Sequence, residues 1–114
     1  MKKFLRAFIY ASNGIIKAMG ERNVRIQTGC AVAVIAAGFY FHITLSEWIT
    51  LLIMISLVLS LELINTAIEN LVDLVSPERK PLAGKIKDIS AGAVLIAAVF
   101  SVIVGILIFA RYLA

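Results

Sequence analysis

Charged residues, cysteine and histidine are scarce in this 114-residue sequence, and each shortage excludes a class of protein or site. Charged side chains make up 16% of the chain and hydrophobic ones 61%. The mean hydropathy is +0.99. This composition excludes an ordinary soluble domain, whose apolar share is about 45–50%. Cys30 is the only cysteine, so no intrachain disulfide can form. His42 is alone too, without an acid or thiol cluster, so we interpret it as an interfacial residue and not a metal ligand.

Several recognisable sequence signals are also absent. The chain has no internal repeat and no low-complexity tract, so its length predicts one domain, 1–114. Lys2, Lys3 and Arg6 precede mixed residues instead of a compact apolar core with a cleavage site, so we expect no secretory signal. No Walker-type glycine-rich loop and no protein-kinase signature occurs. An ATP site in this chain must therefore be of a different kind.

Long apolar runs are abundant, and three segments are long enough to cross a membrane. Ser46 is the expected N-cap of the second segment, and Trp48 is its expected anchor at the membrane surface. Both prolines of the chain lie in 76–81, which is therefore expected to be a loop. The fold class is predicted to be all-α and integral to a membrane. The predicted spans are about 26–45, 47–74 and 84–112.

The N-terminal segment 2–19 has a different pattern, in which apolar residues at helical spacing alternate with basic ones. This pattern predicts an amphipathic helix that lies on the membrane surface. An interruption of this helix would fall at Asn13-Gly14. A basic helix in solvent, with its apolar face packed on the other helices, fits the same pattern equally well.

Lysine and arginine are unevenly distributed along the chain. Six of the eleven precede the first span, none separates the first two spans, four separate the second and third, and one follows. The positive-inside rule then puts the N-terminus and the 75–87 loop in the cytoplasm, with the 43–47 turn and the C-terminus outside. The net charge of +4 fits a face beside anionic lipid better than a nucleic-acid partner. We therefore expect a multi-pass protein of the inner (cytoplasmic) membrane.

The second span carries a polar stripe. At about 100° per residue, Glu62, Glu69 and Asp73 fall within roughly 40° of one another on a helix, and Asn65 lies about 60° to one side. Each carboxylate at membrane depth costs about 2.5–3.5 kcal/mol on insertion scales, so the stripe should face protein, water, metal or substrate. Glu62 is the deepest, about 22 Å along the span and still inside a hydrocarbon core about 30 Å thick.

Charged residues from three helices are predicted to meet at the cytoplasmic interface, and they suit a divalent cation and a phosphorylated ligand. Glu62, which lies deeper in the membrane, is suitably placed to accept a proton from a lipid hydroxyl. Two alternatives remain. The stripe could serve only to hydrogen-bond helices together. It could also belong to an ion relay, although the fully apolar outer half of the second span argues against a continuous path. The residues at this interface are Glu21, Glu69, Asp73, Lys87 and Asp88.

These residues resemble a known family, the small prokaryotic integral-membrane lipid kinases, which comprises diacylglycerol kinase and undecaprenol kinase. The resemblance covers nearly the whole chain and implies three spans and a surface helix, assembled as a homotrimer with active sites shared between subunits. It further implies transfer of the ATP γ-phosphate to a lipid hydroxyl, with Mg²⁺ as the cofactor. Three motifs carry the resemblance: Glu21-Arg22-Asn23, Glu62-x-x-Asn65-Thr66-Ala67-Ile68-Glu69-x-x-x-Asp73 and Ala83-x-x-x-Lys87-Asp88-x-x-Ala91-Gly92-Ala93-Val94.

The resemblance also implies a role for each site residue. Glu62 would be the catalytic base, and Glu21 and Glu69 would hold Mg²⁺. Asn65 and Asp73 would support the site. The residues expected to contact ATP are Glu21, Glu69, Glu78, Arg79, Lys80, Lys87 and Asp88.

Within the family, the likeness is greater to the Gram-positive undecaprenol kinases, on the motifs Glu21-Arg22-Asn23, Glu47-Trp48 and Ala91-Gly92-Ala93-Val94. Ala91 stands where the diacylglycerol enzymes are expected to have a serine that contacts lipid, so we expect the lipid beside Ala91 and Glu62. Undecaprenol is thus the expected substrate, which would give undecaprenyl phosphate. Diacylglycerol, which would give phosphatidic acid, is the alternative. Close helix packing alone would also explain the small residues at Ser90 to Ala93.

Overall fold

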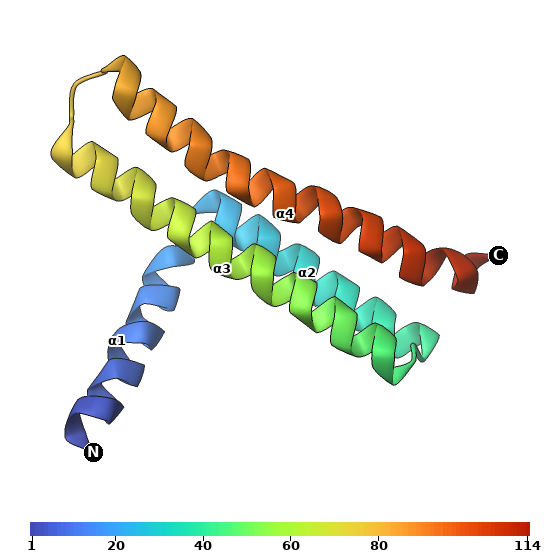
Figure 1. Ribbon diagram of the computed structural model, residues 1–114. Coiled ribbons are helices and arrows are strands. Elements are labelled where there is room, and N and C mark those ends of the chain that lie inside the picture. Colours follow the sequence, from blue (N-terminus) through green and yellow to red (C-terminus); the bar gives the residue numbers. More distant parts are fainter.

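The computed structural model describes all 114 residues and contains four α-helices and no strand. Helices α2, α3 and α4 are each long and apolar enough to cross a membrane, which confirms the predicted all-α class with three candidate spans. The two long helices α3 and α4 form an antiparallel hairpin, and α1 leads away from it (Figure 1). The helices are α1 (Lys2–Ala18), α2 (Arg22–Phe41), α3 (Leu45–Val75) and α4 (Pro81–Leu113).

The helix boundaries differ from the predicted spans by one to four residues, for local reasons. Helix α2 begins at Arg22 and not near 26, because the polar residues ahead of the apolar run are also helical. It ends at Phe41, where His42 adopts the left-handed conformation at φ 53°. Helix α4 begins at Pro81 itself, a position where the missing proline N–H costs nothing.

The N-cap of α3 is Thr44, which corrects the expectation of Ser46. The Thr44 hydroxyl accepts a hydrogen bond from the Glu47 backbone N–H at 3.3 Å, and the Glu47 carboxylate accepts one from the Thr44 N–H at 2.9 Å. This reciprocal capping box satisfies two backbone donors that a helix start leaves free. Ser46 lies in the first turn instead, and its carbonyl accepts a hydrogen bond from the Thr50 hydroxyl at 2.9 Å.

Helix α1 is continuous through Asn13-Gly14 and buries none of its residues. Its apolar side chains, among them Phe4, Phe8 and Ile16, are more than half exposed. Within one chain, α1 therefore does not bury its apolar face on the other helices. An amphipathic helix with four basic and no acidic residues is suited to an anionic membrane surface.

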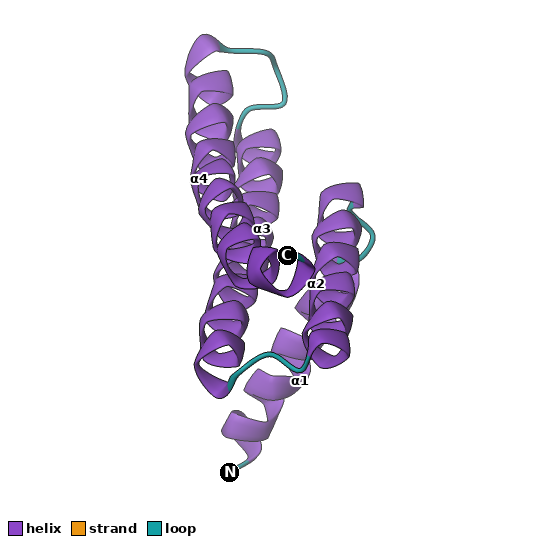
Figure 2. Ribbon diagram, turned by 90° about the vertical axis from the view of Figure 1, so that its right-hand side faces the viewer, coloured by secondary structure: helices purple, strands orange, loops and turns teal.

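Helix α3 is the centre of the bundle. It packs against both α2 and α4, whereas the ribbons of α2 and α4 are separated in the side view (Figure 2). Direct contact between α2 and α4 is slight and includes the rings of Phe41 and Phe109, whose centroids are 6.0 Å apart. Only 13 of the 114 residues are buried, so most of the apolar surface requires lipid or further copies of the chain to cover it. The one buried apolar cluster, Ile43, Leu51 and Ile108, lies beside the α2–α3 turn, which we call the far end.

Gly38, near the end of α2, packs directly against Trp48 of α3. A Cβ at Gly38 would lie 2.6 Å from the Trp48 ring and 3.1 Å from Ile43 Cδ1, which is too close for van der Waals contact. We expect Gly38→Ala to lower the melting temperature in detergent, since overpacking costs about 1–3 kcal/mol. Gly29→Ala on the same helix is the control, because nothing lies within 4 Å of its Cβ. Equal melting temperatures for the two variants would contradict this packing.

Candidate functional site

A polar hollow opens where α2, α3 and α4 come together, and its volume is about 300 Å³. Three residues of α3 line this hollow, namely Glu62, Asn65 and Glu69. This agrees with the prediction that they share one face of the helix. Asn23 and Gln27 of α2 and Ala91 of α4 also line the hollow. The remaining lining residues are apolar: Ile26, Val94, Leu95 and Ala98.

Two polar side chains of this hollow are almost completely buried, Glu62 at 3% exposure and Asn65 at 5%. The Asn65 amide nitrogen Nδ2 donates to Glu69 Oε1 at 3.0 Å, which orients the amide. The amide oxygen Oδ1 is buried and has no hydrogen-bond partner. An unpaired buried acceptor costs about 1–3 kcal/mol, so the hollow is suited to a ligand that brings a hydrogen-bond donor, such as a hydroxyl.

Asp73, the fourth residue of the predicted stripe, lies apart from this hollow. Its carboxylate accepts a hydrogen bond from Lys87 Nζ of α4 at 2.5 Å, and both side chains are partly exposed. The reason is that α3 and α4 continue past the start of α2 (Figure 1), so α4 is the only neighbour at this level. The stripe therefore divides into a buried part and an exposed ion pair.

A second hollow of about 480 Å³ lies beside this ion pair and the α3–α4 loop, and we call it the loop hollow. It brings together four of the residues predicted to contact ATP: Glu78, Arg79, Lys80 and Lys87. Three of these side chains are cationic, which suits phosphate groups. Asp88, predicted with them, is exposed and does not line this hollow.

Glu21 lines neither of these hollows. It is exposed at the corner between α1 and α2, which Arg25 fixes by donating to the carbonyls of Met19 and Gly20 at 3.1 and 2.8 Å. Glu21 lines a separate hollow of about 480 Å³ between α1 and α3. Glu21 and Glu69, the predicted metal ligands, thus line different hollows of the single chain. No group of three potential metal-ligating side chains comes together.

The small residues of α4 have two different environments. Ser90 is buried at 9% exposure, which fits close helix packing. Ala91 is exposed and lines the polar hollow, and a Cβ added to Gly92 would meet nothing within 4 Å. Close packing within one chain therefore explains Ser90 but not Ala91 or Gly92.

Gln27 is the site residue that the sequence motifs missed. It lines the polar hollow and also an apolar cavity of about 90 Å³ farther along the bundle. The only available signal was its place as a strongly polar residue in an otherwise apolar span. Because Gln27 lines both, the polar hollow and the apolar cavity adjoin each other. The cavity is lined by Gln27, Cys30, Ala31, Val34, Leu51, Met54, Ile55, Val58, Leu59, Ser101 and Gly105.

Comparison with known proteins gives a consistent result over nearly the whole chain. Residues 9–109 match the family model of prokaryotic diacylglycerol kinase. The undecaprenol kinase of Bacillus subtilis is 42% identical over 110 residues, which cover 96% of this chain and 89% of that protein. The diacylglycerol kinase of Synechocystis is 45% identical over 103 residues, covering 89% of this chain and 59% of its relative. That of Escherichia coli is 29% identical over 102 residues, covering 89% and 84%. This protein belongs to the prokaryotic diacylglycerol kinase family.

Proposed function

We propose that this protein is a membrane lipid kinase that transfers the γ-phosphate of ATP to the hydroxyl of undecaprenol. Membership of a kinase family supports the reaction class, and the similarity to the Bacillus subtilis undecaprenol kinase supports the choice of lipid. Similar proteins also include diacylglycerol kinases, which makes diacylglycerol the alternative substrate.

One structural observation carries the proposal: the polar hollow and the apolar cavity share Gln27 and adjoin along α3. The lining of the two spaces runs from Glu69 to Leu51, about 27 Å at 1.5 Å per residue, which is most of a hydrocarbon core. Charged groups occur at one end only. A lipid alcohol has the same layout, with one hydroxyl on a long apolar chain. An ion relay would need polar groups along the whole path.

Glu62 then acts as the general base. A lipid hydroxyl that enters the polar hollow can donate to the unpaired Oδ1 of Asn65, and it gives its proton to Glu62 when it reacts. The lipid oxygen forms a bond to the γ-phosphorus, the bond between that phosphorus and the bridging oxygen of ADP breaks, and ADP leaves. No covalent enzyme intermediate is required, since phosphoryl transfer depends on positioning and charge neutralisation.

The nucleotide is proposed to bind at the cytosolic end of the same face. Lys87, held by Asp73, would bind phosphate together with Arg79 and Lys80. Glu21 and Glu69 are the proposed Mg²⁺ ligands, and a donor set of one or two carboxylates with phosphate oxygens is what this ion prefers. When bound, Mg²⁺ neutralises charge on the transferred phosphoryl group. Glu78 and Asp88 complete the proposed nucleotide contacts.

A homotrimer with shared active sites is proposed as the working assembly, in the inner membrane with the site facing the cytoplasm. Two observations support an oligomer: most of the apolar surface is uncovered, and Glu21 and Glu69 line different hollows of one chain. The distribution of lysine and arginine supports the orientation. Cross-linking or native mass spectrometry in detergent tests the assembly, and a monomer with full activity would refute it.

Turnover on undecaprenol and on diacylglycerol, measured side by side in mixed micelles with the same ATP and Mg²⁺, tests the proposed substrate. We expect phosphorylation of undecaprenol with the higher kcat/KM. A clear preference for diacylglycerol would reverse the choice of lipid but leave the reaction class intact. Phosphorylation of neither lipid would overturn the proposed function.

A further inference from the structure

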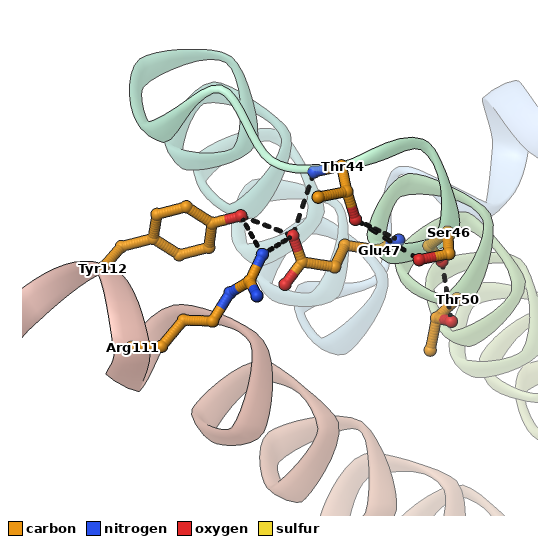
Figure 3. A network of polar contacts seen from close by, with 6 residues as sticks. All are labelled: Thr44, Ser46, Glu47, Thr50, Arg111 and Tyr112. Carbon is orange, nitrogen blue, oxygen red and sulfur yellow. Dashed lines mark hydrogen bonds and ion pairs between the residues drawn. The ribbon is translucent and has the colours of Figure 1, made fainter.

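The most extensive polar network of the protein lies at the far end, away from every residue assigned to the reaction. Glu47 is its centre, and its Oε1 accepts hydrogen bonds from the Thr44 N–H at 2.9 Å, Arg111 Nη2 at 2.8 Å and the Tyr112 hydroxyl at 2.5 Å (Figure 3). Arg111 also donates to the Tyr112 hydroxyl at 2.7 Å. We call Thr44, Glu47, Arg111 and Tyr112 the far-end clasp.

The far-end clasp joins the beginning of α3 to the end of α4. The structure contains only two ion pairs, Glu47–Arg111 in this clasp and Asp73–Lys87 at the opposite end of the same two helices. No other side-chain hydrogen bond connects α3 with α4, and the side-chain bonds of Ser56 and Ser101 stay within their own helices. Between the two ion pairs, α3 and α4 are therefore joined by packing alone, and no side-chain hydrogen bond fixes their register. Apolar helix faces can pack in registers that differ by one turn, about 5.4 Å.

The spacing of the two ion pairs selects one register. Glu47 and Asp73 are 26 residues apart on α3, and Lys87 and Arg111 are 24 apart on α4. At 1.5 Å per residue these separations are about 39 and 36 Å, so both pairs close together when α4 is in the observed register. A shift of α4 by one turn would open both pairs, because a helix moves along its axis as a rigid rod.

We infer that the far-end clasp positions Lys87 for the nucleotide by holding α4 in register on α3. The inference rests on the proposed function in assigning Lys87 to the phosphates of ATP. Glu47, Arg111 and Tyr112 are then positioning residues that act from about 36 Å away. Without the clasp, Lys87 moves along the helix axis relative to Asp73 and Glu69, and the cations of the loop hollow no longer match the phosphates.

The register can be measured without reference to catalysis. Spin labels are attached at Leu74→Cys on α3 and Ile89→Cys on α4, both of which are exposed positions, in a Cys30→Ser background. The distance between the two labels, measured in spin-diluted oligomers in vesicles, reports the register. The test variant is Arg111→Gln/Tyr112→Phe, which removes the positive charge of Arg111 and the hydroxyl of Tyr112 and leaves the capping box of α3 intact. We expect its interlabel distance to shift or broaden by about 5 Å. Tyr112→Phe alone, which removes one donor, should give a smaller change.

Thr50→Val is the matched control. Its hydroxyl lies at the same end of α3 but bonds only to the Ser46 carbonyl of its own helix, at 2.9 Å. The control should keep the distance distribution of the parent protein. An unchanged distribution in the double variant overturns the inference, whatever the kinetics.

The kinetic test separates the clasp from the proposed function. In Arg111→Gln/Tyr112→Phe we expect the KM for ATP to rise by about 3- to 10-fold, with kcat and the KM for lipid nearly unchanged. Adding Lys87→Gln should cause little further rise, because both changes act on one group. Fully additive effects would overturn the inference. A shifted register with no effect of Lys87→Gln on the KM for ATP would instead overturn the nucleotide role of Lys87.

Discussion

Glu62→Gln should lower turnover by about 10²-fold or more, the usual contribution of a general base. Glutamine keeps the shape of the side chain and one acceptor, but it cannot take the proton of a lipid hydroxyl. Glu62 is buried at 3% exposure and lines the polar hollow, so an uncharged replacement should not disturb folding, oligomer state or ATP binding. The measurement is kcat on undecaprenol, with ATP binding and assembly determined on the same preparation.

Thr66→Val is the control for this prediction. The Thr66 hydroxyl donates to the Glu62 backbone carbonyl at 3.0 Å, so its loss changes the neighbourhood of Glu62 but leaves the carboxylate in place. A structural role for Glu62 predicts a different pattern, in which the oligomer is lost and residual activity follows the assembled fraction. A Gln variant with near wild-type turnover would show that Glu62 is not the base, and Asp88 would be the next candidate.

Glu69→Gln and Glu21→Gln should each raise the Mg²⁺ concentration needed for half-maximal turnover by about 10-fold or more, or abolish turnover, because each removes a charged oxygen ligand. Glutamine at position 69 keeps an oxygen that can accept the hydrogen bond from Asn65 Nδ2. The orientation of Asn65 is thereby preserved, and the loss of charge is measured by itself. Mg²⁺ titrations at saturating ATP and lipid give the midpoint, and Mn²⁺ binding followed by electron paramagnetic resonance reports the ion directly.

Glu62→Gln is the internal control for the metal prediction. It is the same chemical change on the same helix, about two turns deeper. It should lower turnover and leave the Mg²⁺ midpoint where it is, whereas Glu69→Gln should move the midpoint. An unchanged midpoint in both Glu21→Gln and Glu69→Gln would remove the metal role of these residues.

The exposed apolar surface of the three spans, which an oligomer would cover, connects these predictions to the assembly. Glu21 lines the hollow between α1 and α3, and Glu69 lines the hollow between α2, α3 and α4. One Mg²⁺ ion bound by both residues therefore needs carboxylates from two different hollows. The proposed trimer would bring such hollows of neighbouring copies together while it covers exposed side chains of the spans. Loss of the oligomer should therefore reduce metal-dependent turnover and thermal stability together.

Much of the architecture was predictable because it follows from local properties of the chain. Helical periodicity alone put Glu62, Asn65 and Glu69 on one face, and all three line the polar hollow. The three candidate spans followed from the length of the apolar runs, since a membrane helix must match the hydrocarbon thickness. The family also followed from the motif spacings, and the comparisons confirm it.

Contacts between helices were not predictable in the same way. Asp73 shares the angular position of Glu62 and Glu69, yet it pairs with Lys87, because α2 does not extend to its level. Gln27 belongs to the site, and Glu47 to the far-end clasp, through neighbours on other helices. The angle of each helix about its own axis, and its register on the next helix, depend on how side chains distant in sequence pack together. Periodicity describes one helix at a time, so these pairings required the folded chain.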